Sequence, residues 1–225
     1  MHNEEDYIAD TIGLMVSSLV HFAPDYEIIV VDDASTDRSG KIVDGIARGN
    51  DRVKVLHNEV NKKLGETLRR GFAACTKDLI FYTDADMPAD IEELRKALRI
   101  MEITGADLVT AYRFDRTAEG FKRSLYSMVY NLLVRFLFGT RVRDINFAFK
   151  LFKRRVLTKV ELAARGSFID AELMIKSDRS GFRTVQFGVD YFARLRGVSE
   201  LWSVDVIMKI MKEMLSYRLG PFRRR

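Results

Sequence analysis

The sequence predicts an α/β fold in which a mostly parallel central sheet is flanked by helices. Short runs of β-branched, aromatic and leucine residues alternate along the chain with stretches of helical character. The chain has 225 residues, of which 47% are hydrophobic, and this is enough to bury one large core. No Pro-, Gly- or Ser-rich linker divides it, so we expect a single α/β domain over most of its length.

Four runs have the length and composition of strands: residues 26–31 (YEIIVV), 53–56 (VKVL), 79–83 (LIFYT) and 107–111 (DLVTA). Residues 37–47 follow the turn-forming DDASTD and are expected to be helical. A second helix is expected over 90–103, with Asp90 as its N-cap and Glu93 completing a capping box. This β-α-β order predicts parallel strands with helices on both faces of the sheet.

Composition argues against several other classes of protein. Cys75 is the single cysteine, so no disulfide framework can form within the chain, and three widely spaced histidines give no zinc-binding pattern. The longest apolar run, 125–139, is shorter than the roughly 20 residues of a membrane span and contains Arg135. The chain starts with acidic residues rather than a signal peptide, so we expect a cytoplasmic protein. A formal net charge of +5, with four arginines in 218–225, favours an anionic partner.

Two of the expected strands end in pairs of acids. Asp32 and Asp33 end the first, and Asp84 and Asp86 follow the strand at 79–83. The carboxyl ends of parallel strands meet at one edge of an open sheet, where ligands bind, so these carboxylates should converge. A divalent cation offsets the repulsion of gathered carboxylates, and hard oxygen ligands suit Mg²⁺ or Mn²⁺. The alternative is a solvated acidic turn before the next helix, because Asp-x-Asp alone is a short motif.

Six motifs occur in a fixed order along the chain: HNEEDYI, EIIVVDDASTDRSG, NKKLGETLRRGFAACTKDLIFYTDADM, AYR, RDINFAFKLFKRRVL and FARLRGVSEL. In this order they resemble family 2 glycosyltransferases, and within that family the branch that transfers sugars to dolichol phosphate or polyprenyl phosphate. The resemblance covers residues 2 to about 201. It implies the GT-A nucleotide-diphospho-sugar transferase fold for a domain at 1–201, followed by a C-terminal segment at 202–225.

The resemblance also implies which residues bind a nucleotide diphosphate sugar. Asn3 and Glu4 would lie beside the base and ribose, and Asp33 would hydrogen-bond the base, with a helix-capping turn as its structural alternative. Asp84, Ala85 and Asp86 match the metal-binding triplet of the family. Asp86 would bind Mg²⁺ or Mn²⁺ directly, and Asp84 would lie near the ribose or the metal-bound waters. The metal would stabilise the leaving nucleoside diphosphate.

A later segment, RLRGVSE, resembles the part of the family that closes over the donor diphosphate. Arg194, Gly197 and Ser199 match that pattern, so Arg194 joins Asp84 and Asp86 as an expected catalytic residue and Ser199 is expected to bind the donor. Glu200 stands where the family has lysine. An acid there would repel a diphosphate, so either Arg196 substitutes, Glu200 points away, or the closure is weakened.

On the acceptor side, the resemblance implies cations that bind the phosphate of a polyprenyl phosphate. Arg113 follows the fourth expected strand, and Arg123 and Ser127 match an Arg-x-x-x-Ser pattern that opens a helix. Their i, i+4 spacing places Arg123 and Ser127 on one helical face. Arginine suits phosphate because its planar fork donates two parallel hydrogen bonds. Surface arginines on a basic helix are the structural alternative.

Three other carboxylates have open roles. Asp144 stands where the family has an aspartate before a Gly-Phe pair, but Ala148 replaces the glycine, so Asp144 is either functional or structural. Asp170 and Glu172 match an acceptor-facing carboxylate of the family. Such a carboxylate would act as general base for a hydroxyl acceptor, whereas a lipid phosphate is already ionised and needs none.

The start of the chain departs from the family. Relatives carry an apolar strand of about five or six residues before the Asn-Glu-Glu motif, and here only Met1 and His2 precede it. That strand is central in the expected sheet, so we predict a GT-A fold with its first strand missing. Apolar surface and backbone hydrogen-bonding groups of its two neighbours would then be exposed.

The C-terminal segment predicts an amphipathic helix and a basic tail. Its apolar residues recur at spacings of three and four: Val204, Ile207, Met211, Met214 and Leu215. Basic residues near an anionic leaflet contribute roughly 1 kcal/mol each, so the arginines of 218–225 favour peripheral membrane binding. Ordinary packing of this helix on the domain is the alternative.

Together these observations predict a metal-dependent hexosyltransferase that moves a sugar from a nucleotide diphosphate sugar to a polyprenyl phosphate at the cytoplasmic membrane face. A GT-A enzyme with a soluble or saccharide acceptor is one alternative, and a catalytically inactive, membrane-associated partner protein is another. Nucleic acid is not an expected partner, because the arginines are not interleaved with aromatics in a known binding module.

Overall fold

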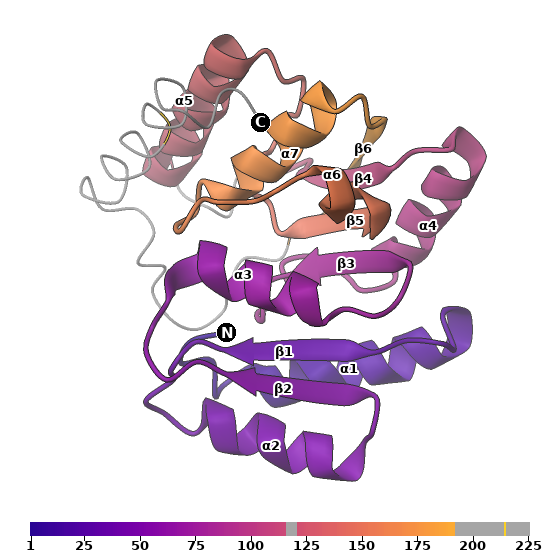
Figure 1. The fold of residues 1–225 in the computed structure, drawn as a ribbon, viewed down its shortest axis with the longest axis vertical. Coiled ribbons are helices and arrows are strands. Elements are labelled where there is room, and N and C mark those ends of the chain that lie inside the picture. The colour runs from indigo at the N-terminus through magenta and orange to yellow at the C-terminus, as the bar shows by residue number, and fades with distance from the viewer. Residues whose placement is uncertain (116–120, 192–213, 215–225) are drawn as a thin grey trace.

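The computed structural model describes residues 1–115, 121–191 and 214, and it has the expected α/β fold (Figure 1). Its elements, in chain order, are α1 (Ile8–Phe22), β1 (Ile28–Asp32), α2 (Ser39–Gly49), β2 (Val53–His57), α3 (Lys63–Ala74), β3 (Leu79–Thr83), α4 (Glu93–Thr104), β4 (Leu108–Arg113), α5 (Phe121–Phe138), β5 (Phe149–Lys153), α6 (Arg155–Lys159), α7 (Ile169–Arg179) and β6 (Thr184–Val189). The strand predicted at 79–83 is confirmed in full, and the other three predicted strands are confirmed with ends shifted by one or two residues.

The strands form two groups. β1 pairs with β2 in parallel, and the order of the other sheet is β3-β5-β4-β6. β4 and β6 are parallel, but β5 runs antiparallel to both β3 and β4. β5 was not predicted from the sequence. It lies between β3 and β4 and brings residues 149–153 into the centre of the sheet.

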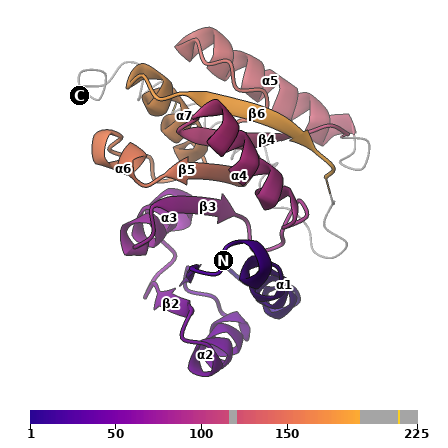
Figure 2. The ribbon, with the colours of Figure 1, turned by 90° about the vertical axis from the view of Figure 1, so that its right-hand side faces the viewer.

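Helices cover both faces, as predicted. One core cluster joins buried residues of α1, α2 and α4 to the sheet, and a second joins α3, α5, α6 and α7 to its other face. Neighbouring residues of a strand belong to different clusters. In β4, Val109 belongs to the first cluster and Leu108 to the second. In the view of Figure 2, α4 lies in front of the strands and α5 lies above β6. The central strands are therefore shielded from water on both sides.

The predicted start of α4 is wrong by three residues. The helix begins at Glu93 rather than at residue 90, and its cap position shows no side-chain hydrogen bond. Asp90 Oδ1 instead accepts a hydrogen bond of 2.9 Å from the Glu92 backbone N–H. Asp90 thus forms a local Asx-type turn ahead of the helix, which competes with the capping box.

The sheet is interrupted between β1 and β3. These strands lie side by side in Figure 1, but they belong to separate hydrogen-bonded sheets. The first strand of the expected fold would lie at this interruption, and within the described residues no strand lies between β1 and β3. Within the described residues, no helix is long and apolar enough to cross a membrane.

His57, at the end of β2, bridges two carboxylates. Its Nδ1 lies 3.0 Å from Asp32 Oδ2, and its Nε2 lies 3.0 Å from Asp44 Oδ1 of α2. Hydrogen bonds to Asp44 and Asp32 raise the pKa of His57 above its ordinary value, against a smaller opposing effect of burial. The imidazolium form therefore ties β2 to α2.

We expect this bridge to make stability fall as pH rises. A histidine whose folded pKa is raised contributes its full stabilisation below the unfolded value of about 6.5 and loses it as pH rises through the folded pKa. His57→Gln should remove this pH dependence above about pH 6.5, as measured by urea denaturation at several pH values. The exposed His21→Gln is the matched control. An unchanged slope in His57→Gln would show that the imidazolium is not responsible.

Candidate active site

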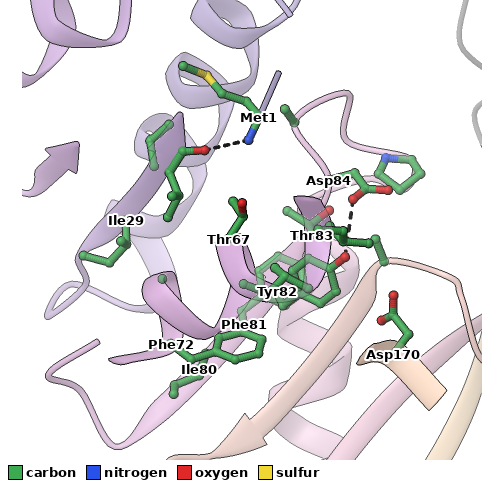
Figure 3. Close-up of a pocket in the computed structure, with 18 of the residues that line it drawn as sticks. Met1, Ile29, Thr67, Phe72, Ile80, Phe81, Tyr82, Thr83, Asp84 and Asp170 are labelled. Carbon is green, nitrogen blue, oxygen red and sulfur yellow. Dashed lines mark hydrogen bonds between the residues drawn. The ribbon is translucent and has the colours of Figure 1, made fainter. Parts of the chain in front are cut away.

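One cavity of about 1650 Å³ contains most of the predicted site. The predicted residues that line it are Glu4, Asp33, Asp84, Ala85, Asp86, Arg113 and Ser127. They come from the N-terminal segment, from the ends of β1, β3 and β4, and from α5. Figure 3 shows part of this cavity, with Asp84 and Asp170 near one end and Met1 near β1. Of the four acids predicted to converge, Asp33, Asp84 and Asp86 line this cavity, whereas the Asp32 carboxylate lies 3.0 Å from His57 Nδ1.

The Asn-Glu-Glu segment is held against the loop that follows β1. Asn3 Oδ1 accepts a hydrogen bond of 2.8 Å from the Thr36 backbone N–H, and the Asn3 N–H donates to Ser35 Oγ at 3.0 Å. The Glu4 N–H donates to Ser39 Oγ at 2.8 Å. Asn3 has a φ of +55°, a conformation that asparagine tolerates better than most residues. These bonds place Glu4 at the cavity wall, with Asn3 behind it as a support of the loop.

The Asp33 carboxylate is buried and accepts three strong hydrogen bonds. Its donors are Asn58 Nδ2 at 2.7 Å and the backbone N–H groups of Lys62 at 2.8 Å and Lys63 at 3.0 Å. Burial acts to raise the pKa of Asp33, but these donors outweigh it and hold the pKa below its ordinary value. Asp33 therefore stays ionised and caps the start of α3, which is the structural alternative named above. Its contact with a base remains a prediction.

The Asp84-Ala85-Asp86 triplet forms a tight turn at the end of β3. The Met87 N–H donates to Asp84 O at 3.1 Å, and Thr11 Oγ1 of α1 donates to Ala85 O at 2.6 Å. Tyr82 Oη lies 3.5 Å from Asp84 Oδ1. The turn is thus fixed from two sides, with both Asp84 and Asp86 at the cavity wall.

The donor set of this turn fits a hard divalent cation with few protein ligands. Among the described residues, no group of three or more His, Cys, Asp or Glu side chains is arranged to hold a metal. Asp84 and Asp86 would supply one or two carboxylate oxygens, and water and phosphate oxygens would complete the shell. Mg²⁺ is usually held in this way, through one or two carboxylates plus substrate phosphates.

Arg113, the predicted phosphate ligand at the end of β4, is paired with Asp144. Its Nε and one terminal nitrogen lie 2.7 Å and 2.8 Å from the two carboxylate oxygens of Asp144. Both side chains are buried, and the rings of Phe147 and Tyr191 flank the guanidinium at 5.3 Å. Asp144 therefore has at least a structural role. A phosphate bound by Arg113 would meet a guanidinium whose fork already holds a carboxylate.

The other predicted basic and closing residues cannot be placed. The side chain of Arg123 and residues Arg194, Arg196, Gly197, Ser199 and Glu200 lie outside the described residues, as does 202–225 apart from Met214. Ser127 of α5 is buried at the cavity wall, and its carbonyl oxygen accepts a hydrogen bond of 2.8 Å from Asn131 Nδ2.

The structure separates Asp170 from Glu172. Asp170 lines the cavity, whereas Glu172 Oε2 accepts hydrogen bonds of 2.8 Å from the backbone N–H groups of Ala163 and Ala164. Glu172 thus supports the segment before α7. Of the two candidate carboxylates, Asp170 is the one placed to face a ligand.

Lys150 of β5 is a site residue that the sequence analysis missed. Its ammonium is 1% exposed and donates to Asp170 Oδ1 at 2.6 Å and to Phe147 O at 2.7 Å. It also lies 5.5 Å from the ring centroid of Tyr82, its cross-strand partner. Burial raises the pKa of Asp170, while the Lys150 ammonium opposes the rise. Burial and the carboxylates around it, Asp170 foremost, raise the pKa of Tyr82, so its hydroxyl stays protonated.

Known proteins resemble the chain in sequence and in fold. Residues 1–160 match the family Glycosyl transferase family 2. Glycosyltransferase AglD of Haloferax volcanii is 30% identical over 197 residues, covering 84% of this chain and 32% of AglD. Polyprenol monophosphomannose synthase of Mycolicibacterium smegmatis is 30% identical over 208 residues, covering 85% of this chain and 76% of the synthase. The chain thus spans about a third of the first relative and three quarters of the second.

Solved structures have the same fold. The glucosyl-3-phosphoglycerate synthase of Mycobacterium tuberculosis with Mn²⁺, UDP-glucose and phosphoglyceric acid superposes with a TM-score of 0.72 at 24% identity, covering 98% of this chain and 78% of that one. Its complex with Mg²⁺ and UDP gives a TM-score of 0.73 at 24% identity, with 98% and 77% covered. These structures confirm the GT-A fold class, and the match over residues 1–160 shows that the chain belongs to glycosyl transferase family 2.

Proposed function

We propose that this chain transfers a sugar from a nucleotide diphosphate sugar to a polyprenyl phosphate. The observation that carries the proposal is the single cavity that holds Asp33, Asp84 and Asp86 together with Arg113 and Ser127. The first three are the donor-side residues implied by the family, and the last two are on the acceptor side. Relatives named as polyprenol monophosphomannose synthase and undecaprenyl-phosphate 4-deoxy-4-formamido-L-arabinose transferase support a lipid phosphate acceptor.

The proposed donor site uses Mg²⁺ or Mn²⁺ held by Asp86, with Asp84 beside it. When bound, the cation supplies Lewis-acid stabilisation of the leaving diphosphate. Asp33 and the loop fixed by Asn3 form the wall beside the base and ribose. Thr11 and Tyr82 hold the Asp84-Ala85-Asp86 turn in place, so that the two carboxylates need little reorganisation when a donor binds.

Asp170 suits an acceptor that is already ionised. Its Oδ1 already accepts a hydrogen bond of 2.6 Å from the Lys150 ammonium, so that oxygen is engaged before any acceptor binds. A phosphate oxygen does not need its proton removed, whereas a sugar hydroxyl does. Through its pair with Lys150, Asp170 would therefore help to orient an acceptor that binds on this side of the cavity.

A soluble acceptor is the second candidate, and Met214 favours it. Met214 is one of the apolar residues predicted to face a bilayer, yet it is 1% exposed and lies in the second core cluster. At this position the C-terminal segment packs on the domain, which is the alternative named in the sequence analysis. The structural neighbour with phosphoglyceric acid is an example of a phosphorylated soluble acceptor on this fold.

The two acceptors can be separated by a transfer assay. The protein with Mn²⁺ is first screened against a panel of nucleotide sugars by thermal shift, since a ligand that binds the native state raises its stability. The donor found in this way is then offered polyprenyl phosphate, phosphoglycerate or free saccharides, and product is measured by mass. We expect a glycosylated polyprenyl phosphate. Product from phosphoglycerate or a saccharide alone would support the soluble alternative, and donor binding without any product would support an inactive partner protein.

An apolar stripe on α5 supports peripheral membrane binding. Met128, Leu132 and Phe136 follow one another at four-residue intervals, and 60%, 64% and 84% of their surfaces are exposed. The stripe starts one residue after Ser127, which lines the cavity. A bilayer against this face would bring a lipid phosphate close to the acceptor side.

We expect Leu132→Ser/Phe136→Ser to reduce sedimentation with anionic liposomes several-fold, because it removes apolar area that would enter the interface. Deleting 218–225 should also reduce sedimentation. Raising the salt concentration should reproduce the effect of this deletion but not that of the double substitution, because salt screens the charges of the arginines. Ile103→Ser is the control, since Ile103 is an equally exposed apolar residue on α4. If the unaltered protein does not sediment with anionic liposomes at low salt, the soluble acceptor becomes the better proposal.

A further inference from the structure

The cations that line the active-site cavity differ in whether they already have a partner. Among the described residues, the lysines and arginines at the cavity wall are Lys63, Lys77, Arg113 and Arg165. Two of these four are paired with a carboxylate, since Lys77 is bonded to Asp25 and Arg113 to Asp144. An anion that enters the cavity therefore competes with a carboxylate for half of its cations.

Lys63 and Arg165 are the other two cations. Within residues 1–115 and 121–191, neither side chain forms an ion pair or a hydrogen bond. Both residues are exposed although they line the cavity, so their charges lie at its rim, where a ligand arrives from solvent. Unpaired cations at the rim of a cavity attract an anionic ligand and can donate charge-assisted hydrogen bonds to it.

Lys63 has a backbone conformation that lysine rarely adopts. Its φ is +69°, in the left-handed region that favours glycine. Its N–H donates to Asp33 Oδ2 at 3.0 Å and to Asn61 Oδ1 at 3.1 Å, and these bonds hold the conformation in place. A glycine would make the same backbone bonds with less strain. The presence of lysine here therefore indicates a role for its side chain.

Arg165 lies on a segment that is clamped between two helices. From α3, the Gly65 N–H donates to Arg165 O at 2.9 Å, and Arg69 donates to Ala164 O at 3.0 Å. From α7, Glu172 Oε2 accepts a hydrogen bond of 2.8 Å from the Ala164 N–H. A Cβ on Gly65 would lie 2.1 Å from Ala164 O, so a residue with a side chain could not approach this closely. The backbone that carries Arg165 is thus fixed against the start of α3.

This contact brings the two unpaired cations to the same side of the cavity. Lys63 is the first residue of α3, two positions before Gly65, and Gly65 bonds directly to Arg165. The Lys63 N–H bonds to Asp33, which is the residue expected beside the base of a nucleotide. Lys63 and Arg165 therefore border the donor side of the cavity.

The donor side needs cations besides a divalent metal ion. The carboxylates of Asp84 and Asp86 would offset the charge of a divalent cation bound there, and this leaves the charge of a diphosphate largely uncompensated. Lysine supplies a compact positive charge, and arginine a planar fork that matches two phosphate oxygens.

We propose that Lys63 and Arg165 bind phosphate oxygens of a ligand in this cavity, and that the diphosphate of the nucleotide sugar is their source. This inference rests on the proposed function and names two residues of the donor site that the sequence analysis did not identify. The phosphate of the acceptor is the other source of the same chemistry, and the experiment separates the two.

The test uses the full chain with Mn²⁺ and titrates inorganic pyrophosphate, UDP and GDP by calorimetry. We expect Lys63→Gly and Arg165→Gln each to weaken the binding of pyrophosphate, and of whichever nucleotide binds, by about tenfold or more, because each loses a charge-assisted hydrogen bond. Lys41→Gln and Arg99→Gln are the matched controls, since each removes one exposed cation that does not line the cavity. Both controls should bind the three probes as the unaltered protein does.

Lys63→Gly also separates binding from backbone strain. Glycine adopts a φ of +69° readily and keeps the N–H that bonds to Asp33, so the melting temperature of this variant should be maintained or raised. Weaker binding at an undiminished melting temperature is a result that a purely structural role of Lys63 would not give. Lys63→Arg keeps the charge and should recover most of the affinity.

The remaining outcomes decide the source of the phosphate. If both variants bind the three probes normally but their KM for polyprenyl phosphate or phosphoglycerate rises, the two cations bind the acceptor phosphate instead of the donor. If neither binding nor KM changes, or if the unaltered protein binds none of the three probes, the proposal is overturned. If the unaltered protein binds pyrophosphate through these two cations but binds neither nucleotide, the phosphate site stands and the proposed function fails.

Discussion

Replacing Asp86 with asparagine is expected to reduce sugar transfer by on the order of 10³-fold while leaving the fold intact. The side chain lies on the turn after β3 at the cavity wall, and asparagine preserves its shape but removes its charge. Loss of a metal ligand forfeits several kcal/mol of transition-state stabilisation, and each 1.36 kcal/mol is a factor of ten in rate. The measurement is initial rate with saturating donor and Mn²⁺, alongside the circular dichroism and melting temperature of the variant.

Asp90→Asn is the matched control for this prediction. Asp90 is exposed four residues further along, and its Oδ1 accepts the Glu92 N–H, a bond that asparagine also makes. We expect this variant to retain full activity and Mn²⁺ binding, and Asp86→Asn to lose both. Turnover above a tenth of the unaltered rate in Asp86→Asn, at unchanged metal concentration, would contradict the assignment of Asp86 as the metal ligand.

The positions of the acidic turns could be predicted from sequence because strand ends are local features. An apolar run followed by Asp33 or by Asp84 and Asp86 is sufficient to place these residues at a strand mouth, and parallel strands bring such mouths to one edge. The hydrogen bonds of Asp33 could not be predicted in this way. Its donors Asn58 and Lys62 belong to the loop between β2 and α3, whose path depends on how those two elements pack.

Ion pairs between residues far apart in the chain could not be predicted from the sequence. Arg113 and Asp144 are separated by 31 positions, and nothing in either local motif indicates that they meet.

The ambiguity between Asp170 and Glu172 has a clearer physical answer. Residues two apart on a helix point about 200° away from one another, so only one of the two can face the cavity. Which one does is decided by the rotation of α7 against the sheet, and this is a property of the packed core.

Lys150 illustrates a further limit. In FKLFK, the alternation of the first three residues taken alone would place Lys150 on a solvent-exposed face. β5 lies between β3 and β4 with helices on both faces, so this lysine is buried and requires a counter-charge. That counter-charge, Asp170, comes from α7, 20 positions away.

Lys150→Met is expected to destabilise the protein by about 3–5 kcal/mol, because it leaves Asp170 as an uncompensated charge in the core. For a chain of this size that corresponds to a fall in melting temperature of about 10 °C. The loss should depend on pH with a predictable sign. Without Lys150, the folded pKa of Asp170 rises further above its unfolded value of about 3.9. The variant is therefore least impaired at acidic pH, and its deficit relative to the unaltered protein grows as pH rises through the raised folded pKa of Asp170.

A double variant distinguishes the buried charge from lost packing. Lys150→Met/Asp170→Asn removes the lone carboxylate while retaining its shape, so we expect it to recover most of the stability lost in Lys150→Met at neutral pH. Asp170→Asn alone should be destabilised as well, since it leaves the Lys150 ammonium buried without its carboxylate partner. The coupling energy follows from urea denaturation of all four proteins. If the double variant is as unstable as the sum of the two single ones, the cost lies in the side-chain volume of Lys150 against Tyr82 and not in the ion pair.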